Sequence, residues 1–130
     1  MTDSGGCMVI SWTRLLGTAR VTIHTGDKAL RLYVEEALRD HAQLAVEAGA
    51  HGPVGTTPHL VLVDLDPPHA VDTLRAYTQR SSRVPTIALT RDTDLQPRLA
   101  AFANGADDVI ALPAAHQEIA ARVRALLRRS

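Results

Sequence analysis

His59-Leu-Val-Leu-Val-Asp64 decides the fold, because four consecutive apolar residues run up to a single carboxylate. A short, nearly continuous apolar run is typical of a parallel strand that helices cover on both faces. Working outward from it, four more segments have strand character, at 20–24, 43–47, 84–89 and 107–111. Because helix-like segments separate most of these strands, the sequence predicts a parallel α/β sheet with right-handed crossovers.

The predicted helices have recognisable ends and apolar faces. Asp27 is the expected N-cap of a helix that runs to about His41, and Asn104-Gly105 is a typical helix stop. A helix at 70–80 is expected to turn Val71, Leu74 and Tyr77 inward, and Leu95, Leu99, Phe102 and Ala103 mark the next one. A final helix carries the apolar stripe Ile119, Val123, Leu126 and Leu127.

Two regions are harder to interpret. Residues 10–19 are expected to form a short helix carrying Trp12, Leu15 and Leu16, within an N-terminal extension at 1–19 that precedes a folded domain at 20–130. Residues 48–58 contain three Gly and two Pro, which is the composition of a loop.

Composition excludes several classes of function. The chain has 130 residues, 45% of them hydrophobic, and its 14 basic and 14 acidic side chains cancel, so we expect one globular domain that does not bind nucleic acid directly. No apolar run approaches the roughly 20 residues that span a membrane, and the first residues do not have the layout of a signal peptide. One cysteine allows no internal disulfide, so a cytoplasmic location is expected.

The carboxyl ends of parallel strands form the crevice where such sheets bind ligands. The residues expected there are Thr25, Gly26, Asp27, Asp64, Asp66, Thr90, Arg91, Leu112 and Pro113. The six histidines have no metal-ligand spacing, and no metal site is predicted.

These segments resemble a response-regulator receiver domain of the OmpR/PhoB-like branch. The resemblance rests on four motifs in order: Pro58 to Pro68, Val84 to Thr90, Gly105 to Pro113 and Ala121 to Arg129. It implies a flavodoxin-like, doubly wound five-stranded sheet of order 2-1-3-4-5, here with the second helix short or lost. It also implies a phospho-acceptor position at Asp64, a switch hydroxyl at Thr90 and a cis Leu112-Pro113 bond.

The sequence departs from that family at the residues that phosphoryl transfer requires. The acidic pair that holds Mg²⁺ in a working receiver is replaced by Thr25 and Gly26, and the lysine before the proline is Leu112. The usually small residue after the switch threonine is Arg91. Because phosphoryl transfer depends on positioning and charge stabilisation, we expect Asp64 not to function as an acceptor, and Mg²⁺ to bind weakly.

Several roles stay open for the charged residues of the crevice. Asp27 and Asp66 either rebuild a weak cation site or serve as a helix cap and a turn residue. Arg91 either pairs with Asp64, imitating the metal or the lysine, or points to solvent.

A second face matches the family's dimer interface, formed by the fourth helix, the fifth strand and the fifth helix. Residue by residue, the resemblance implies ion pairs between Arg98 and Glu118, Asp108 and Arg122, and Asp107 and Arg129. Glu118, Arg122 and Arg129 are 4 and 7 residues apart, so they share one helix face. A solvated charged face is the alternative interpretation.

The expected function is therefore an atypical receiver that is not an enzyme, needs no cofactor and works as a phosphorylation-independent regulatory module. We expect a homodimer, and a DNA-binding domain or partner protein outside this chain; whether the reading frame continues past Ser130 discriminates a regulator with such a domain from a stand-alone adaptor. The alternatives are a conventional receiver phosphorylated at Asp64, a flavodoxin-like flavin protein, a stand-alone adaptor, and a crevice that binds a small effector.

Overall fold

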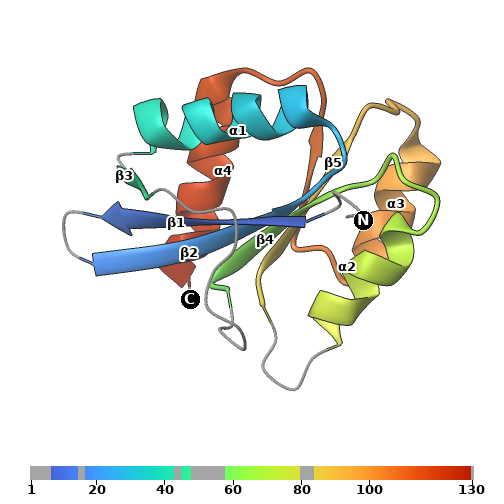
Figure 1. Cartoon of the computed structure of the whole chain (residues 1–130). Coiled ribbons are helices and arrows are strands. Elements are labelled where there is room, and N and C mark those ends of the chain that lie inside the picture. The colour runs from blue at the N-terminus through green and yellow to red at the C-terminus, as the bar shows by residue number, and fades with distance from the viewer. Residues whose placement is uncertain (1–6, 15–16, 43–44, 48–57, 80–83, 130) are drawn as a thin grey trace.

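The computed structural model of the protein describes residues 7–14, 17–42, 45–47, 58–79 and 84–129 (Figure 1). Within these ranges the strands are β1 (Cys7–Arg14), β2 (Gly17–His24), β3 (Ala45–Glu47), β4 (Leu60–Asp64), β5 (Thr86–Thr90) and β6 (Asp108–Ala111). The helices are α1 (Lys28–His41), α2 (Ala70–Thr78), α3 (Leu95–Ala103) and α4 (His116–Arg129). None of these helices is long and apolar enough to cross a membrane.

The strands form one sheet between two layers of helices. Its order is β3-β1-β2-β4-β5-β6, and the last four strands are mutually parallel. Helices α1 and α4 cover one face, whereas α2 and α3 cover the other (Figure 1). The prediction of a parallel α/β sheet with helices on both faces is confirmed, and the four parallel strands lie in the expected order.

The N-terminal edge of the sheet corrects two expectations. The short helix expected at 10–19 is wrong, because β1 and β2 form an antiparallel hairpin in which Cys7 pairs with His24 and Arg14 with Gly17. The sheet therefore has six strands rather than five, and the strand expected at 43–47 appears as β3, paired antiparallel to β1 instead of lying beside the first parallel strand.

The physical reason for both differences lies in the residues of β1. This segment includes Val9, Ile10, Trp12 and Thr13, whose β-branched and aromatic side chains favour an extended backbone once a neighbouring strand is present. The division of the chain at residue 19 stays a prediction. The loop expected at 48–58 and the second helix expected to be lost there lie outside the described residues, apart from Pro58.

Strand β4 shows why an uninterrupted apolar run is needed at the centre of the sheet. Leu60 and Leu62 are buried against the α1 and α4 layer, whereas Val61 and Val63 are buried against the α2 and α3 layer. Successive side chains of a strand point to opposite faces, so a strand covered on both sides must be apolar at every position. Only its last residue, Asp64, departs from this pattern.

Helices α2 and α3 bury fewer of their apolar side chains than helices α1 and α4 do on the opposite face of the sheet. Helix α1 buries the expected stripe of Leu30, Val34, Ala37 and Leu38. In α2, Ala70 and Leu74 face the sheet and Tyr77 is partly buried, but Val71 is 41% exposed, so its expected inward position is wrong.

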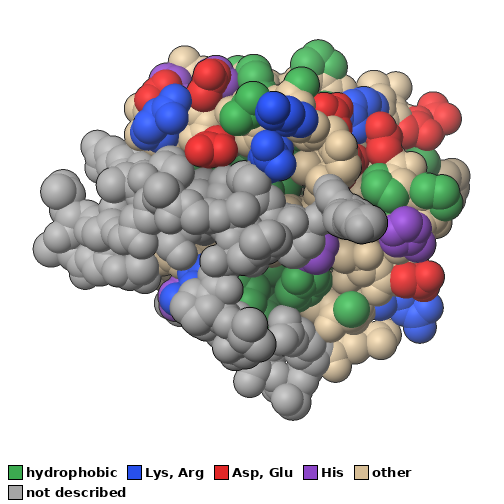
Figure 2. All heavy atoms as spheres, in the orientation of Figure 1, with side chains coloured by type: hydrophobic (Ala, Val, Ile, Leu, Met, Phe, Trp, Pro, Cys, Tyr) green, Lys and Arg blue, Asp and Glu red, His purple; other side chains and the backbone are tan. Residues whose placement is uncertain are grey.

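Helix α3 leaves its large apolar side chains in solvent. Leu95, Leu99 and Phe102 are each about half exposed, and among its residues only Ala101 is buried. Figure 2 shows hydrophobic side chains among charged ones on the side of the molecule where α2 and α3 lie, and charges of both signs along α1.

Helix α3 ends at the expected position. The backbone N–H of Gly105 donates to the carbonyl of Phe102, and that of Ala106 donates to the carbonyl of Ala101. Gly105 has a φ of 102°, a conformation that glycine adopts without strain. A Cβ at this position would lie 2.6 Å from Cβ of Thr78 in α2, so the glycine also permits close packing between α2 and the loop.

We predict that Gly105→Ala lowers the free energy of unfolding by about 1–3 kcal/mol, because it combines a positive φ with a steric clash. Urea denaturation measures this change. Gly26→Ala is the matched control, since a Cβ at Gly26 would meet no atom within 4 Å. Equal urea midpoints for Gly105→Ala and the wild-type protein would contradict the prediction.

Candidate functional site

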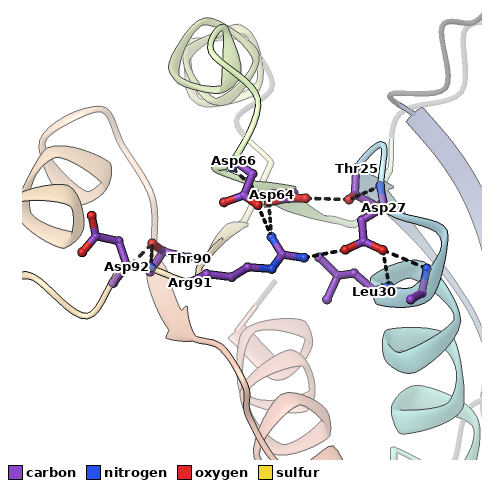
Figure 3. Close-up of polar contacts among 9 residues, drawn as sticks. Thr25, Asp27, Leu30, Asp64, Asp66, Thr90, Arg91 and Asp92 are labelled. Carbon is purple, nitrogen blue, oxygen red and sulfur yellow. Dashed lines mark hydrogen bonds and ion pairs between the residues drawn. The ribbon is translucent and has the colours of Figure 1, made fainter.

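The crevice lies where β2, β4 and β5 end. Thr25 follows the last residue of β2, Asp64 is the last residue of β4, and Arg91 follows the last residue of β5. Parallel strands bring these ends to one edge of the sheet, as the sequence predicted. Figure 3 shows their side chains converging, together with those of Asp27 and Asp66.

Asp64 is a buried carboxylate whose two oxygens both have donors. Its side chain is 3% exposed. Oδ2 accepts a hydrogen bond of 2.6 Å from the Thr25 hydroxyl, and Oδ1 accepts from the backbone N–H of Asp66 at 3.0 Å and from Nη1 of Arg91 at 3.3 Å. A buried charge must be paired and hydrogen-bonded, and here the neighbouring loops supply those partners.

Arg91 is the cation of the crevice. Besides Asp64, its Nη1 donates to Oδ2 of Asp66 at 2.6 Å, and its Nη2 donates to Oδ2 of Asp27 at 2.8 Å. Of the two expected alternatives, the structure has the one in which Arg91 pairs with Asp64, and the one in which it points to solvent is wrong; whether Arg91 imitates the metal or the lysine stays a prediction. Three carboxylates surround one guanidinium, so two negative charges of the cluster are not compensated within it.

Asp27 combines two roles that the sequence left as alternatives. Its Oδ1 accepts from the backbone N–H groups of Ala29 at 2.9 Å and Leu30 at 3.1 Å, which is the expected N-cap of α1. Its Oδ2 faces the crevice and binds Arg91. Thr25 also helps to hold this turn, because its hydroxyl oxygen accepts from the backbone N–H of Asp27 at 3.0 Å.

Thr90 and Leu112 complete the crevice without contributing charge. The buried Thr90 hydroxyl accepts from the backbone N–H of Asp92 at 3.0 Å and donates to the carbonyl of Asp92 at 3.3 Å, so it is bonded within its own loop. Leu112 is buried at the end of β6. The Leu112-Pro113 bond is cis, as the family resemblance implied.

The residues of the crevice do not fit a magnesium ion while Arg91 lies among the carboxylates. Mg²⁺ needs several oxygen ligands in an octahedron, and Asp27, Asp64 and Asp66 each give an oxygen to the guanidinium instead. Within the described residues, no three His, Cys, Asp or Glu side chains are grouped so that they could hold a metal ion.

The second predicted face places Arg122 at its centre. Nη1 of Arg122 donates to both oxygens of Asp108, at 3.1 and 2.9 Å, and its Nε donates to Oε2 of Glu118 at 3.2 Å. Hydrogen bonding to Asp108 raises the pKa of Arg122 above its already high ordinary value. These pairs lie within one chain, and the Asp107 carboxylate accepts from the backbone N–H of Thr86 at 2.8 Å.

Arg98 and Arg129 complete this predicted face. Arg98 is partly buried on α3, and Arg129 is exposed at the end of α4. Among the described residues, the ion pairs of this face within the chain are those of Arg122 with Asp108 and Glu118, and the expected pairs Arg98–Glu118 and Arg129–Asp107 remain predictions for a dimer.

Two features of the site escaped the sequence analysis. The Tyr33 hydroxyl donates to the carbonyl of Ala114 at 2.6 Å, which ties α1 to the loop after β6. A ring nitrogen of His24 is hydrogen-bonded to the Tyr77 hydroxyl on the other face of the sheet, and burial lowers the pKa of His24. The sequence did contain one signal for the Tyr33 contact: Tyr33 lies three residues after Leu30, and therefore at the edge of the buried stripe of α1.

Comparison with known proteins finds transcriptional and response regulators by sequence and a receiver domain by fold. No family model matches the chain. It is 42% identical over 71 residues to the probable transcriptional regulatory protein y4xI of Sinorhizobium fredii, covering 55% of this chain and 30% of that protein. It is 41% identical over 75 residues to the DNA-binding response regulator MtrA of Mycolicibacterium paratuberculosis, covering 56% and 33%. The matches thus span about a third of the length of these relatives.

A solved structure extends the likeness beyond the matched segments. The BeF3-activated receiver domain of DrrB, a Thermotoga maritima OmpR/PhoB homologue, superposes with a TM-score of 0.65 at 26% identity. The superposition covers 79% of this chain and 92% of that domain. Sequence and fold together support a response-regulator receiver domain of the OmpR/PhoB type.

We predict that Arg91→Ala makes the stability of this protein depend on magnesium. Removing the guanidinium leaves the charges of Asp27, Asp64 and Asp66 without a cation, so we expect Mg²⁺ to draw these carboxylates together in the folded state, and a ligand that binds only the folded state raises its Tm. Thermal denaturation with and without MgCl₂ should show a Tm increase for Arg91→Ala and none for the wild-type protein. Arg75→Ala, an exposed arginine of α2, is the matched control. The same response to MgCl₂ in all three proteins would contradict the prediction.

Proposed function

We propose that this chain is an atypical receiver domain that works without phosphorylation, as a regulatory and dimerisation module of a transcriptional regulator. The observation that carries the proposal is the position of Arg91 among Asp27, Asp64 and Asp66. Because the Arg91 guanidinium is part of the chain, it gives the crevice a positive charge without any added metal ion or phosphoryl group. This supports a domain that works without phosphorylation.

Phosphoryl transfer would meet three obstacles in this crevice. The Asp64 oxygens already bind Thr25, Arg91 and a backbone N–H, so attack on a phosphodonor would first break these bonds. Leu112 supplies no charge where the family has a lysine. Transfer depends on metal and cationic groups that offset the charge of the moving phosphoryl group, and a single guanidinium already shared by three carboxylates is a weak substitute.

The transcriptional part of the proposal rests on the relatives. Both curated relatives are named as transcriptional or DNA-binding regulators, and each is about three times as long as the segment that matches. The chain itself has no net charge, which does not favour direct binding to nucleic acid. We therefore assign DNA binding to a domain or partner protein outside these residues.

The alternative is a conventional receiver that accepts a phosphoryl group at Asp64. The geometry that favours it is the retention of Asp64 and Thr90 at the ends of adjacent strands β4 and β5. Under this alternative the Arg91 side chain, which is 36% exposed, would swing outward and free the carboxylates for Mg²⁺.

A phosphodonor reaction separates the two. We predict that acetyl phosphate with Mg²⁺ adds no phosphoryl group to the wild-type protein, because the acceptor lacks a metal site and a lysine. Intact-mass measurement reads the result on wild type, Asp64→Ala and a Thr25→Asp, Arg91→Ala, Leu112→Lys variant that restores one acid of the family's pair and its lysine. The restored variant is expected to gain the adduct. A wild-type adduct that disappears in Asp64→Ala would overturn the proposal in favour of the alternative.

The proposed dimer face joins a charged cluster to an apolar helix. Arg122, Asp108 and Glu118 lie on α4 and β6, and the adjoining α3 leaves Leu99 and Phe102 about half exposed. Charged pairs set register and specificity, whereas apolar area supplies most of the binding free energy. In a two-fold dimer, Asp108 and Arg122 of one chain would face Arg122 and Asp108 of the other.

We predict that Arg122→Glu weakens self-association by roughly tenfold, which corresponds to about 1.4 kcal/mol for the two symmetry-related pairs together. Sedimentation velocity at micromolar concentrations measures the change. Arg124→Glu, the same charge reversal on the same helix, is the control and should leave association unchanged.

Mixing single variants shows whether the pair acts between chains. Asp108→Arg and Arg122→Glu each place like charges within one chain, but a heterodimer of the two has opposite charges in both cross-chain pairs. The mixture should therefore dimerise more strongly than either variant alone. A mixture no better than its components, or a monomeric wild-type protein, would contradict the proposed interface.

A further inference from the structure

A pocket of about 450 Å³ lies beside the crevice, between the start of α1 and the loop that joins β6 to α4. Its lining includes Leu30 and Tyr33 from α1, Leu112 and Pro113 from the loop, and the charged residues Asp27 and Arg91. The volume is in the range of small-molecule sites, which are mainly apolar and carry a few placed polar groups. The pocket shares Arg91 and Leu112 with the crevice, whereas none of its lining residues belongs to the proposed dimer face.

The walls of the pocket are apolar and held in place. Leu30 is part of the buried stripe of α1, and Leu112 is buried at the end of β6. The Tyr33 hydroxyl is bonded to the carbonyl of Ala114, so the polar end of this side chain is occupied while the residue still lines the pocket. An apolar ligand body would therefore meet carbon atoms on several sides.

Arg91 supplies the pocket with hydrogen-bond donors. A guanidinium has five N–H groups, and the three bonds to Asp27, Asp64 and Asp66 use three of them. Within the described residues the remaining two, on Nε and Nη2, have no acceptor. A ligand that reaches Arg91 from the pocket would therefore present a hydrogen-bond acceptor, such as a carbonyl oxygen.

Ionised ligands fit the cluster less well than a neutral acceptor. A carboxylate or phosphate would approach three carboxylates of which one guanidinium compensates only one, and like charges at such short range are repulsive even near a protein surface. An ammonium group carries no acceptor for the two remaining N–H groups of Arg91, and the Asp27 oxygens are already bonded to the start of α1 and to Arg91.

We propose that this pocket binds an uncharged, mainly apolar small molecule that carries one carbonyl-type acceptor, directed at Arg91. As a means of regulation the inference rests on the proposed function, because the ligand would act on the cation that replaces phosphorylation. Binding of the small molecule is measured without a phosphodonor and does not depend on dimerisation. The binding proposal and the proposed function can therefore fail separately.

Four probes of similar size test the chemistry: acetophenone, ethylbenzene, benzoate and benzylamine. Titrations followed by ¹H–¹⁵N NMR should show saturable shifts for acetophenone at the amides of Leu30, Tyr33, Leu112 and Ala114. Ethylbenzene, which lacks the acceptor, should bind roughly tenfold more weakly, the equivalent of one hydrogen bond to a charged group. The two charged probes should bind more weakly than acetophenone.

Variants locate the site and identify the donor. Leu112→Lys places a charge within the pocket and should abolish acetophenone binding, whereas Val71→Lys, on exposed α2 across the sheet, should not. Arg91→Ala should remove the preference for acetophenone over ethylbenzene. No saturable shift at these amides, binding that Leu112→Lys leaves intact, or a preference that survives Arg91→Ala would each overturn the inference.

Discussion

The Arg91 guanidinium, held between Asp64 and Asp66 on one side and Asp27 on the other, is the interaction on which the functional end of this molecule depends. It links the loops that follow β2, β4 and β5. Asp64 is buried, and a buried carboxylate without a partner would destabilise the fold. Arg91 thus supplies, from within the chain, a positive charge beside this buried carboxylate.

This pairing has consequences beyond the crevice. Arg91 stands at the start of the loop that leads into α3, and α3 carries the exposed Leu95, Leu99 and Phe102. The bonds that Arg91 makes in the crevice therefore lie next to the segment from which the proposed dimer face begins. In a two-state receiver, only a ligand or modification with different affinity for the two states can shift their populations. Under the proposed function, the bonds of Arg91 lie within the chain itself, so the active arrangement would need no added group.

The sequence predicted the centre of the fold well and its edge poorly. The uninterrupted run of β4, the Asp27 cap and the Gly105 stop are local signals, because each follows from a few adjacent residues. The β1–β2 hairpin was missed, since strand pairing depends on a partner that periodicity within residues 10–19 does not reveal. The crevice residues were placed correctly by the topology, but the direction of a long side chain such as Arg91 depends on neighbours far along the chain.

The most direct test of the account is a titration of the wild-type protein with beryllofluoride and Mg²⁺, which together imitate a phosphoryl group on an acceptor aspartate. The readouts are the ¹H–¹⁵N spectrum and the dimer fraction by sedimentation. If Arg91 permanently occupies the crevice, the amides of Asp64, Thr90 and Arg91 should keep their positions and the dimer fraction should not change. Saturable shifts at these amides, accompanied by an increase in dimer, would show that the crevice still responds to phosphorylation and would contradict the account.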